Sequence, residues 1–147
     1  MENIIIREMR ENELDEVINL VLDVFMKYEA PDYSEDGINS FKEFVLDKEK
    51  IKTLNILVAE IDSKIVSMIA VRNNTHITLL FTHEDYHRKG IAKKLFETVK
   101  NSLQKGTTIT VNSSPYAVEV YKKLGFVIEE DEQTVDGIRF TKMKLEI

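Results

Sequence analysis

The sequence predicts an α/β domain with a mixed, mostly antiparallel sheet of six to seven strands flanked by about four helices. Segments rich in Ile, Val, Leu and Thr alternate with segments whose apolar residues recur at helical spacing. Pairs of turn-forming residues separate several of these segments. A length of 147 residues, of which 43% are hydrophobic, suits one domain with its own core. We therefore expect a single domain over residues 1–147.

The first third of the chain is expected to form one strand and two helices. Residues 4–9 begin with an unbroken apolar run, which is typical of a short buried strand. Apolar residues then recur at helical spacing over residues 12–28. Asn12 is a suitable N-cap for this helix, and acidic residues follow in the first turn, where the helix dipole favours them. A proline-containing segment at 30–32 ends it, and a shorter helix is predicted over 38–47.

The middle of the chain changes from helical to strand-like composition. Residues 53–60, 64–71 and 75–82 are rich in Ile, Val, Leu and Thr, which favour strands. The dipeptides Asp62-Ser63 and Asn73-Asn74 separate these segments, and both are good turn formers. We therefore expect an antiparallel meander of three strands.

The C-terminal part alternates helices and strands. Apolar spacing predicts a helix over residues 91–103, and a strand is expected over 107–112. The helix predicted over 115–124 begins with a proline, which suits the first helical position, and is followed by a glycine, which suits a helix end. Residues 126–130 and 138–145 are then expected to pair as a final hairpin.

Composition excludes several classes of protein. The formal net charge of −6 argues against coating nucleic acid, which usually requires a basic face. The absence of cysteine excludes disulfides, thiolate metal sites and a thiol nucleophile. The N-terminal segment has only three consecutive apolar residues, so neither a signal peptide nor a spanning helix is expected there. We expect a cytoplasmic protein with neither nucleic-acid nor membrane partners.

A basic segment stands where a predicted strand gives way to a helix. Residues 87–105 contain six basic residues and one acid, although the chain as a whole is acidic. Within it, Gly90 lets the backbone approach a ligand closely, and Ala92 leaves space beside the first helical turn. Free N–H groups at a helix start attract anions. The segment indicates a diphosphate-binding turn, although a lysine-rich solvated helix face would give the same charge pattern.

Two blocks of the sequence resemble those of the GNAT N-acetyltransferase superfamily. Residues 80–92, which end in His87-Arg88-Lys89-Gly90-Ile91-Ala92, resemble its acyl-CoA signature, Gln/Arg-x-x-Gly-x-Gly/Ala after a hydrophobic strand. Residues 112–126, with Asn112, Ala117 and the run from Tyr121 to Gly125-Phe126, resemble its second block, Asn…Ala…Tyr-x-x-x-Gly-Phe. The predicted element order also matches over essentially the whole chain. One departure is His87, which stands where the family usually has Gln or Arg.

The resemblance implies transfer of an acetyl group from acetyl-CoA, the cosubstrate, to the primary amine of a small molecule or protein in a direct ternary complex. It places the following residues at the coenzyme: Phe81, Thr82, His87, Arg88, Lys89, Gly90, Ile91, Ala92, Lys93 and Asn112. Tyr121 matches the family's general acid, and a phenol with a pKa of ~10 is protonated at pH 7. Alternatively, the Tyr121 ring only packs between a helix and the sheet, and Asn112 only ends a strand.

A base or a water chain must also take a proton, because an ammonium group with a pKa of ~10.4 cannot attack a thioester. Some relatives carry an ionisable residue early on the strand before the phosphate turn, and His76 occupies about that place. Its intrinsic pKa of ~6.5 suits a base. A solvated histidine near a turn is the simpler interpretation of His76, and His83, Glu84 or a water chain are alternatives.

The resemblance places the acceptor site mainly on the first helical pair. Residues 11–36 contain nine acids and one base, which favours a cationic acceptor such as a polyamine, an amino sugar or a protein amine. Asp32 is the expected charged contact, and Phe25, Tyr28 and Tyr33 are expected to supply an apolar wall. Capping, solvated surface and core packing are the competing explanations for these residues.

Two rival functions stay open at this point. The same fold would also serve as a CoA-binding sensor without turnover. The segment His83-Glu84-x-x-His87 matches the H-E-x-x-H pattern of zinc hydrolases, but it directly follows a strand-like run and precedes a glycine, whereas the zinc site needs both histidines on one helix face. We therefore expect no metal. The resemblance is also compatible with a homodimer, because members of the family often pair through sheet edges.

Overall fold

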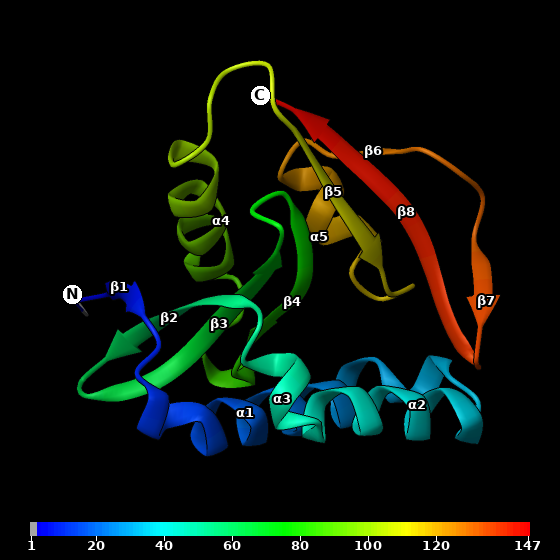
Figure 1. Cartoon of the computed structure of the whole chain (residues 1–147), viewed down its shortest axis with the longest axis horizontal. Coiled ribbons are helices and arrows are strands. Elements are labelled where there is room, and N and C mark those ends of the chain that lie inside the picture. The colour runs from blue at the N-terminus through cyan, green and yellow to red at the C-terminus, as the bar shows by residue number, and fades with distance from the viewer. Residues whose placement is uncertain (1–2) are drawn as a thin grey trace.

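The computed structural model describes residues 3–147, which form an eight-stranded sheet with helices on both faces (Figure 1). The strands lie in the order β1-β2-β3-β4-β5-β8-β6, and β7 also pairs with β8. The strands are β1 (Ile5–Glu8), β2 (Asn55–Ile61), β3 (Lys64–Arg72), β4 (His76–Thr82), β5 (Thr108–Ser113), β6 (Val127–Ile128), β7 (Gln133–Val135) and β8 (Ile138–Glu146). The helices are α1 (Leu14–Tyr28), α2 (Glu35–Leu46), α3 (Lys48–Ile51), α4 (Ile91–Asn101) and α5 (Val118–Lys123), with short 3₁₀ turns η1 (Glu11–Glu13), η2 (Ala30–Asp32) and η3 (Glu84–Tyr86).

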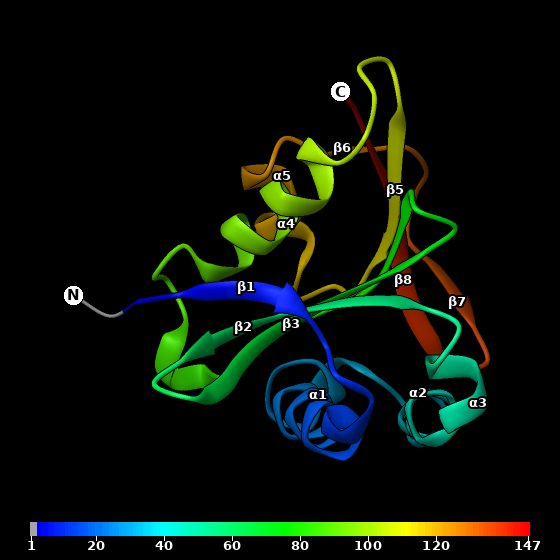
Figure 2. The same ribbon diagram turned by 60° about the vertical axis from the view of Figure 1, so that its left-hand side comes forward.

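The helices divide between the two faces of the sheet (Figure 2). α1 packs on β3 and β4, and α2 lies beside it, so their apolar stripes form one core cluster with the sheet. α4 covers the opposite face over β2, β3 and β4, and its buried residues form a second cluster together with Tyr121 of α5. Burial of an apolar stripe from each helix explains why the sheet is covered on both sides.

The pairing between β4 and β5 is the feature that creates space for a site. These two parallel strands pair only at His76–Thr110 and Ile77–Val111, and beyond that point they diverge. β4 also carries a bulge against β3, because Leu79 lies opposite Ala70 and Ile77 opposite Val71. Thr78 is the extra residue of this bulge. A bulge bends and twists a strand, which is consistent with the divergence of β4 from β5.

The predicted fold class is confirmed, including the antiparallel meander β2-β3-β4 and the pairing of residues near 127 with β8. Both predicted turn dipeptides adopt positive φ, as tight hairpin turns require. Two short elements were not predicted. α3 forms because the Asp47 side chain caps it by accepting from the backbone N–H of Lys50, and β7 forms a hairpin with β8 through Asp136-Gly137.

The β7–β8 turn packs directly onto α2. A Cβ built on Gly37 of α2 would collide with the carbonyl group of Gly137, so the two backbones approach more closely than any side chain at position 37 permits. The Ser40 hydroxyl donates a hydrogen bond of 2.9 Å to the carbonyl oxygen of Asp136 in the same turn. This contact holds the hairpin beside the gap between β4 and β5.

Candidate active site

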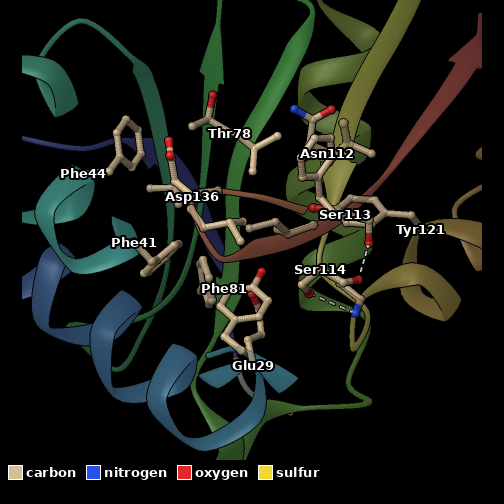
Figure 3. A pocket seen from close by; sticks show the side chains of 18 residues that line it. Glu29, Phe41, Phe44, Thr78, Phe81, Asn112, Ser113, Ser114, Tyr121 and Asp136 are labelled. Carbon is tan, nitrogen blue, oxygen red and sulfur yellow. Dashed lines mark hydrogen bonds between the residues drawn. The ribbon is translucent and has the colours of Figure 1, made fainter. Parts of the chain in front are cut away.

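Two cavities meet where β4 and β5 diverge. The larger, about 470 Å³, lies between the β4–α4 turn and α5, and we call it the basic cleft; its walls include His87, Arg88, Lys93, Lys123 and Tyr116. The smaller, about 300 Å³, lies between α2, β4, β5 and the β7–β8 hairpin, and we call it the aromatic pocket; its walls include Tyr33, Phe41, Phe44, Phe81, Phe140 and Asp136 (Figure 3). The residues that line both cavities are Glu29, Leu80, Phe81, Ala117 and Tyr121.

The start of α4 opens into the basic cleft. Gly90 is the N-cap residue, with φ 76°, and no side chain caps this helix end. α1, α2 and α5 each carry acidic residues in the first turn, whereas α4 carries none. Ile91, Ala92 and Lys93 of the first turn of α4 line the cleft. The backbone N–H groups and the positive end of the α4 dipole therefore lack an acidic partner from the helix's own first turn and suit an anionic ligand.

Basic side chains reinforce this preference. Arg88, Lys93 and Lys123 line the basic cleft, and Glu29 is the single acid among the residues that line it. Arg88 has φ 63°, which is a left-handed conformation uncommon for this residue type, and it directly precedes the turn to Gly90. A Cβ on Gly90 itself would meet nothing within 4 Å, so the backbone there faces open space. The cleft fits a polyanion such as a diphosphate.

Most residues predicted from the coenzyme signature line this one cleft: Phe81, Thr82, His87, Arg88, Gly90, Ile91, Ala92 and Lys93. Lys89 is not among the lining residues, and its Nζ lies 5.3 Å from the centre of the Tyr86 ring. Asn112 lines the aromatic pocket instead. Its place near the end of β5 still brings it beside the gap, but on the other side from the α4 turn.

His87, the departure from the family signature, helps to close the turn. Its Nε2 lies 2.6 Å from the carbonyl oxygen of Thr82, and a carbonyl oxygen only accepts, so His87 donates this hydrogen bond. Its ring packs against Tyr28, with ring centres 5.0 Å apart. The Ser67 hydroxyl donates to the carbonyl oxygen of Phe81 at 3.0 Å. These bonds fix the end of β4, which forms a wall of both cavities.

Tyr121 lies at the junction of the two cavities. α5 places it there with only 5% of its surface exposed, and its ring contacts Phe126 edge to face. Burial and the charge of Glu29 raise the pKa of the Tyr121 phenol above its usual value. The phenol is therefore fully protonated at neutral pH and can act as a proton donor.

Glu29 is the residue that the sequence reasoning did not single out. It follows α1 directly, is half-buried and lines both cavities. Burial raises the pKa of Glu29 to about 7, the nearby charge of Asp32 adds to this, and a hydrogen bond from Ser114 acts in the opposite direction. An acidic residue at the C-terminal end of a helix opposes the dipole, and this mismatch is the signal by which the sequence could have indicated it.

His76, the predicted base, is not among the residues that line either cavity. It stands at the start of β4, where β4 still pairs with β5, and its Nδ1 lies 2.8 Å from the Thr110 hydroxyl. Burial and the nearby Arg72 lower the pKa of His76. The structure thus places His76 where the sheet is closed, and Glu29 where it is open.

Most of the predicted acceptor residues are displaced from the cavities. Phe25 is fully buried and stacks on Phe41, with ring centres 3.8 Å apart. Tyr28 packs against Tyr116 and donates a hydrogen bond of 3.3 Å to Glu84. Asp32 is exposed, and its backbone carbonyl accepts from Arg139. These three residues line neither cavity, whereas Tyr33, the third residue of the predicted apolar wall, lines the aromatic pocket.

The H-E-x-x-H segment does not lie on an α-helix. Glu84 belongs to the 3₁₀ turn η3, and its carboxylate pairs with Lys27 at 2.6 Å. His83 Nδ1 accepts from the backbone N–H of Asp85, while His87 donates to a carbonyl group. Within residues 3–147, no group of three or more His, Asp or Glu side chains is placed to hold a metal ion.

Comparison with known families settles the broad identity of the chain. A family model described as an acetyltransferase (GNAT) domain matches residues 29–147. The chain belongs to the GNAT acetyltransferase family. Membership makes the protein an acyltransferase, in agreement with the resemblance in the sequence. A comparison with curated protein sequences finds no match for this GNAT acetyltransferase.

Solved structures share the fold of this GNAT acetyltransferase at low sequence identity. A GCN5-related N-acetyltransferase from Rhodopseudomonas palustris has a TM-score of 0.84 and 19% identity, covering 100% of this chain and 98% of the other. The PaiA N-acetyltransferase of Thermoplasma acidophilum, solved in complex with coenzyme A, has a TM-score of 0.75 and 21% identity, with 99% of each chain covered. YjaB of Escherichia coli in its apo form has a TM-score of 0.77 and 20% identity, with 97% of each covered.

No helix formed by residues 3–147 combines the length and the hydrophobicity that crossing a membrane requires.

Proposed function

We propose that this protein transfers the acetyl group of acetyl-CoA directly to a primary amine. The observation that carries the proposal is the position of Tyr121, a buried and protonated phenol on the wall that separates a basic cleft from an aromatic pocket. A proton donor placed between an anion site and a second cavity with acidic and aromatic walls suits a reaction between two ligands.

The basic cleft is proposed to hold the coenzyme. The uncapped start of α4 and the side chains of Arg88, Lys93 and Lys123 match the charge of a diphosphate and a phosphate. The last residues of β4, Phe81 and Thr82, line the same cleft and would accompany the pantetheine arm. The coenzyme A complex of the Thermoplasma acidophilum neighbour supports this assignment through the shared fold.

Bound acetyl-CoA supplies the acetyl group as a thioester, whose sulfur leaves as a thiolate. Tyr121 is proposed to protonate that sulfur, because its phenol keeps its proton at neutral pH and lies where the two cavities meet. The absence of cysteine is compatible with direct transfer, which needs no acyl-enzyme. The aromatic pocket is proposed to bind the amine.

The test combines coenzyme binding with thiol release. Calorimetry should detect acetyl-CoA and CoA binding, and a panel of primary amines should release thiol from acetyl-CoA. Tyr121→Phe keeps the ring but removes the proton donor, so we expect kcat to fall by about 10²-fold with CoA affinity unchanged within about twofold. CoA binding without turnover on any amine would instead favour a non-catalytic sensor, and no CoA binding would refute the proposal.

A further inference from the structure

We propose that Glu29 binds the ammonium group of the acceptor and takes its proton, and that the acceptor is a primary amine carried on an apolar, ring-bearing body. This inference rests on the proposed acetyl transfer and deepens it, because it names the acceptor class and a further catalytic residue. It follows from the walls of the aromatic pocket and from the surroundings of Glu29.

The walls of the aromatic pocket fit a flat apolar group. Phe41 and Phe44 of α2, Phe81 of β4 and Phe140 of β8 line it together with Tyr33. In Figure 3, the labelled Phe41 and Phe44 project from α2 and Phe81 from β4, while β8 supplies Phe140. A volume of about 300 Å³ suits a small ring-bearing molecule, and aromatic walls favour rings by stacked or edge contacts.

The charges of the pocket restrict the rest of the acceptor. Glu29 and Asp136 are the ionisable acids on its walls, and no lysine, arginine or histidine is among the residues that line it. The two acids differ in burial, since Asp136 is exposed in the β7–β8 turn and Glu29 is half-buried beside Tyr121. A cationic group is therefore favoured at the inner end of the pocket, and an anionic acceptor is disfavoured.

Glu29 has no cationic partner among the residues that the structure describes. A hydrogen bond from the Ser114 hydroxyl favours the ionised form of Glu29. The Ser114 hydroxyl is itself held by the backbone N–H of Ala117, which donates to it at 3.2 Å (Figure 3). Across residues 3–147, no lysine, arginine or histidine forms an ion pair with it. A half-buried carboxylate that lacks a cation is available to pair with the ammonium group of a ligand.

Among the described residues, Arg88, Lys93 and Lys123 share the basic cleft with Glu29, but Asp32 is the one charged group that shifts the pKa of Glu29. Asp32 raises its pKa, and the phenols of Tyr33, Tyr116 and Tyr121 interact with its charge without supplying a cation. A carboxylate whose pKa is about 7 can accept a proton near neutral pH and return it to solvent. The aqueous pKa of an alkylammonium group is ~10.4, and burial beside apolar walls lowers it. This reduces the pKa difference between the ammonium group and Glu29, and so the cost of moving the proton between them.

The proton and bond changes balance with the residues present. Glu29 takes the first proton of the ammonium group and later releases it to solvent. The freed nitrogen bonds to the carbonyl carbon of the thioester as the carbon–sulfur bond breaks. Tyr121 protonates the sulfur, and the second proton of the nitrogen restores the phenol, directly or through water. The net products are the amide, the free thiol and one released proton.

Glu29→Gln tests the proposal because it keeps the shape of the side chain and its ability to accept from Ser114. With 2-phenylethylamine and acetyl-CoA, we expect kcat/KM at pH 7.5 to fall by about 10²-fold. In the wild type, kcat/KM should rise with pH through an apparent pKa of about 7, and this limb should be absent in Glu29→Gln. With the β,β-difluoro analogue of 2-phenylethylamine, whose ammonium group is far more acidic, Glu29→Gln should lower kcat/KM much less.

A matched control is Asp23→Asn, which removes the same charge from an exposed side chain of α1 that lines neither cavity. We expect kcat/KM within about twofold of wild type. A readout that needs no turnover is calorimetry of 2-phenylethylamine with CoA-saturated protein, where Glu29→Gln should weaken binding at least tenfold and Asp23→Asn should not. Among acceptors, 2-phenylethylamine should exceed spermidine and glucosamine in kcat/KM by at least tenfold.

The outcomes separate this inference from the proposed function. Turnover that keeps its rate and pH profile in Glu29→Gln would overturn the role of Glu29 and leave acetyl transfer standing. A preference for spermidine or glucosamine would overturn the acceptor class. If 2-phenylethylamine binds through Glu29 but no thiol is ever released, acetyl transfer fails while the ammonium site is supported.

Discussion

The basic cleft and the aromatic pocket share five wall residues but have opposite electrostatic character. The cleft is lined by Arg88, Lys93 and Lys123 and receives the N-terminal end of α4. The pocket is lined by Glu29 and Asp136 and has no basic residue among its described walls. Glu29 itself follows the C-terminal end of α1. Two helix ends of opposite sign thus face one opening in the sheet.

Under the proposed function, one break in the sheet serves two ligands. The break needs only the bulge at Thr78 and the short pairing of β4 with β5. The helix ends on either side then determine which charge each cavity accepts, because the positive end of one dipole and the negative end of another extend into it. Substitutions at residues that line only one of the two cavities should therefore affect the ligand of that cavity alone.

Gly90→Glu should have the largest effect, and only on the basic cleft. A side chain at φ 76° strains the backbone, and its negative charge would oppose the coenzyme phosphates at the start of α4. We expect CoA affinity to fall by more than about 100-fold by calorimetry. Gly106→Glu is the matched control, because Gly106 has φ 93°, open space around its Cβ position and a place in the loop between α4 and β5, away from the cleft. Equal losses in both variants would show that the turn is misassigned.

Glu29→Gln should stabilise the protein at the same time as it impairs the pocket. The folded pKa of Glu29, about 7, is raised above its unfolded value, so folding favours the protonated carboxyl and stability is lost as pH rises through 7. Removing the charge should raise the free energy of unfolding at pH 8 by about 2 kcal/mol, or Tm by roughly 5 °C, with little change at pH 4. Denaturant unfolding at both pH values checks this. A destabilised variant at pH 8 would contradict the burial of an unpaired charge.

Lys123→Gln should weaken coenzyme binding moderately. Lys123 lines the basic cleft, whereas its neighbour Lys122 pairs with Glu119 outside it at 3.5 Å. Loss of one partly exposed charge corresponds to about 0.5–1 kcal/mol, so CoA affinity should fall about two- to fivefold, and less at high salt. Lys122→Gln, which removes the same charge, should leave affinity unchanged. The same loss in both variants would mean that only the overall charge matters.

Asp32→Lys should have the smallest effect. The sequence placed Asp32 at the acceptor, but the side chain is exposed and is not among the walls of either cavity. We expect the KM for cationic amines to change by less than about twofold, because exposed charges are well screened. A large rise in KM would show that the acceptor binds near η2, outside the aromatic pocket.

Local sequence signals were enough to predict the meander and the basic turn before α4 that is proposed to hold the coenzyme. Gly90 and its basic neighbours form one short segment, and the dipeptides Asp62-Ser63 and Asn73-Asn74 act within their own hairpins. Tyr121 was located by a motif that combines its spacing from Asn112 with the following Gly-Phe pair. Each of these features depends on neighbours in the chain, which a single sequence displays.

The acceptor side depends on contacts between distant segments, which a single sequence does not display. Among the acids of residues 11–36, Glu29 differed only in its place at the end of a helix, and its burial beside Tyr121 and Ser114 depends on the fold. Phe25 and Phe41 have the same helical spacing signal, yet only Phe41 lines the pocket. The β7 strand was missed because it is only three residues long, although Asp136-Gly137 is a strong hairpin signal.

The contact between Gly37 and Gly137 has a consequence for how this enzyme could acquire other acceptors. The two glycines seat the hairpin that carries Asp136 against α2, so any larger residue at position 37 must push that hairpin outward. The displaced hairpin would enlarge the aromatic pocket without disturbing the α4 turn, which lies on the opposite side of the gap. A single substitution at a site remote from the chemistry is thus a route to bulkier substrates under an unchanged coenzyme requirement.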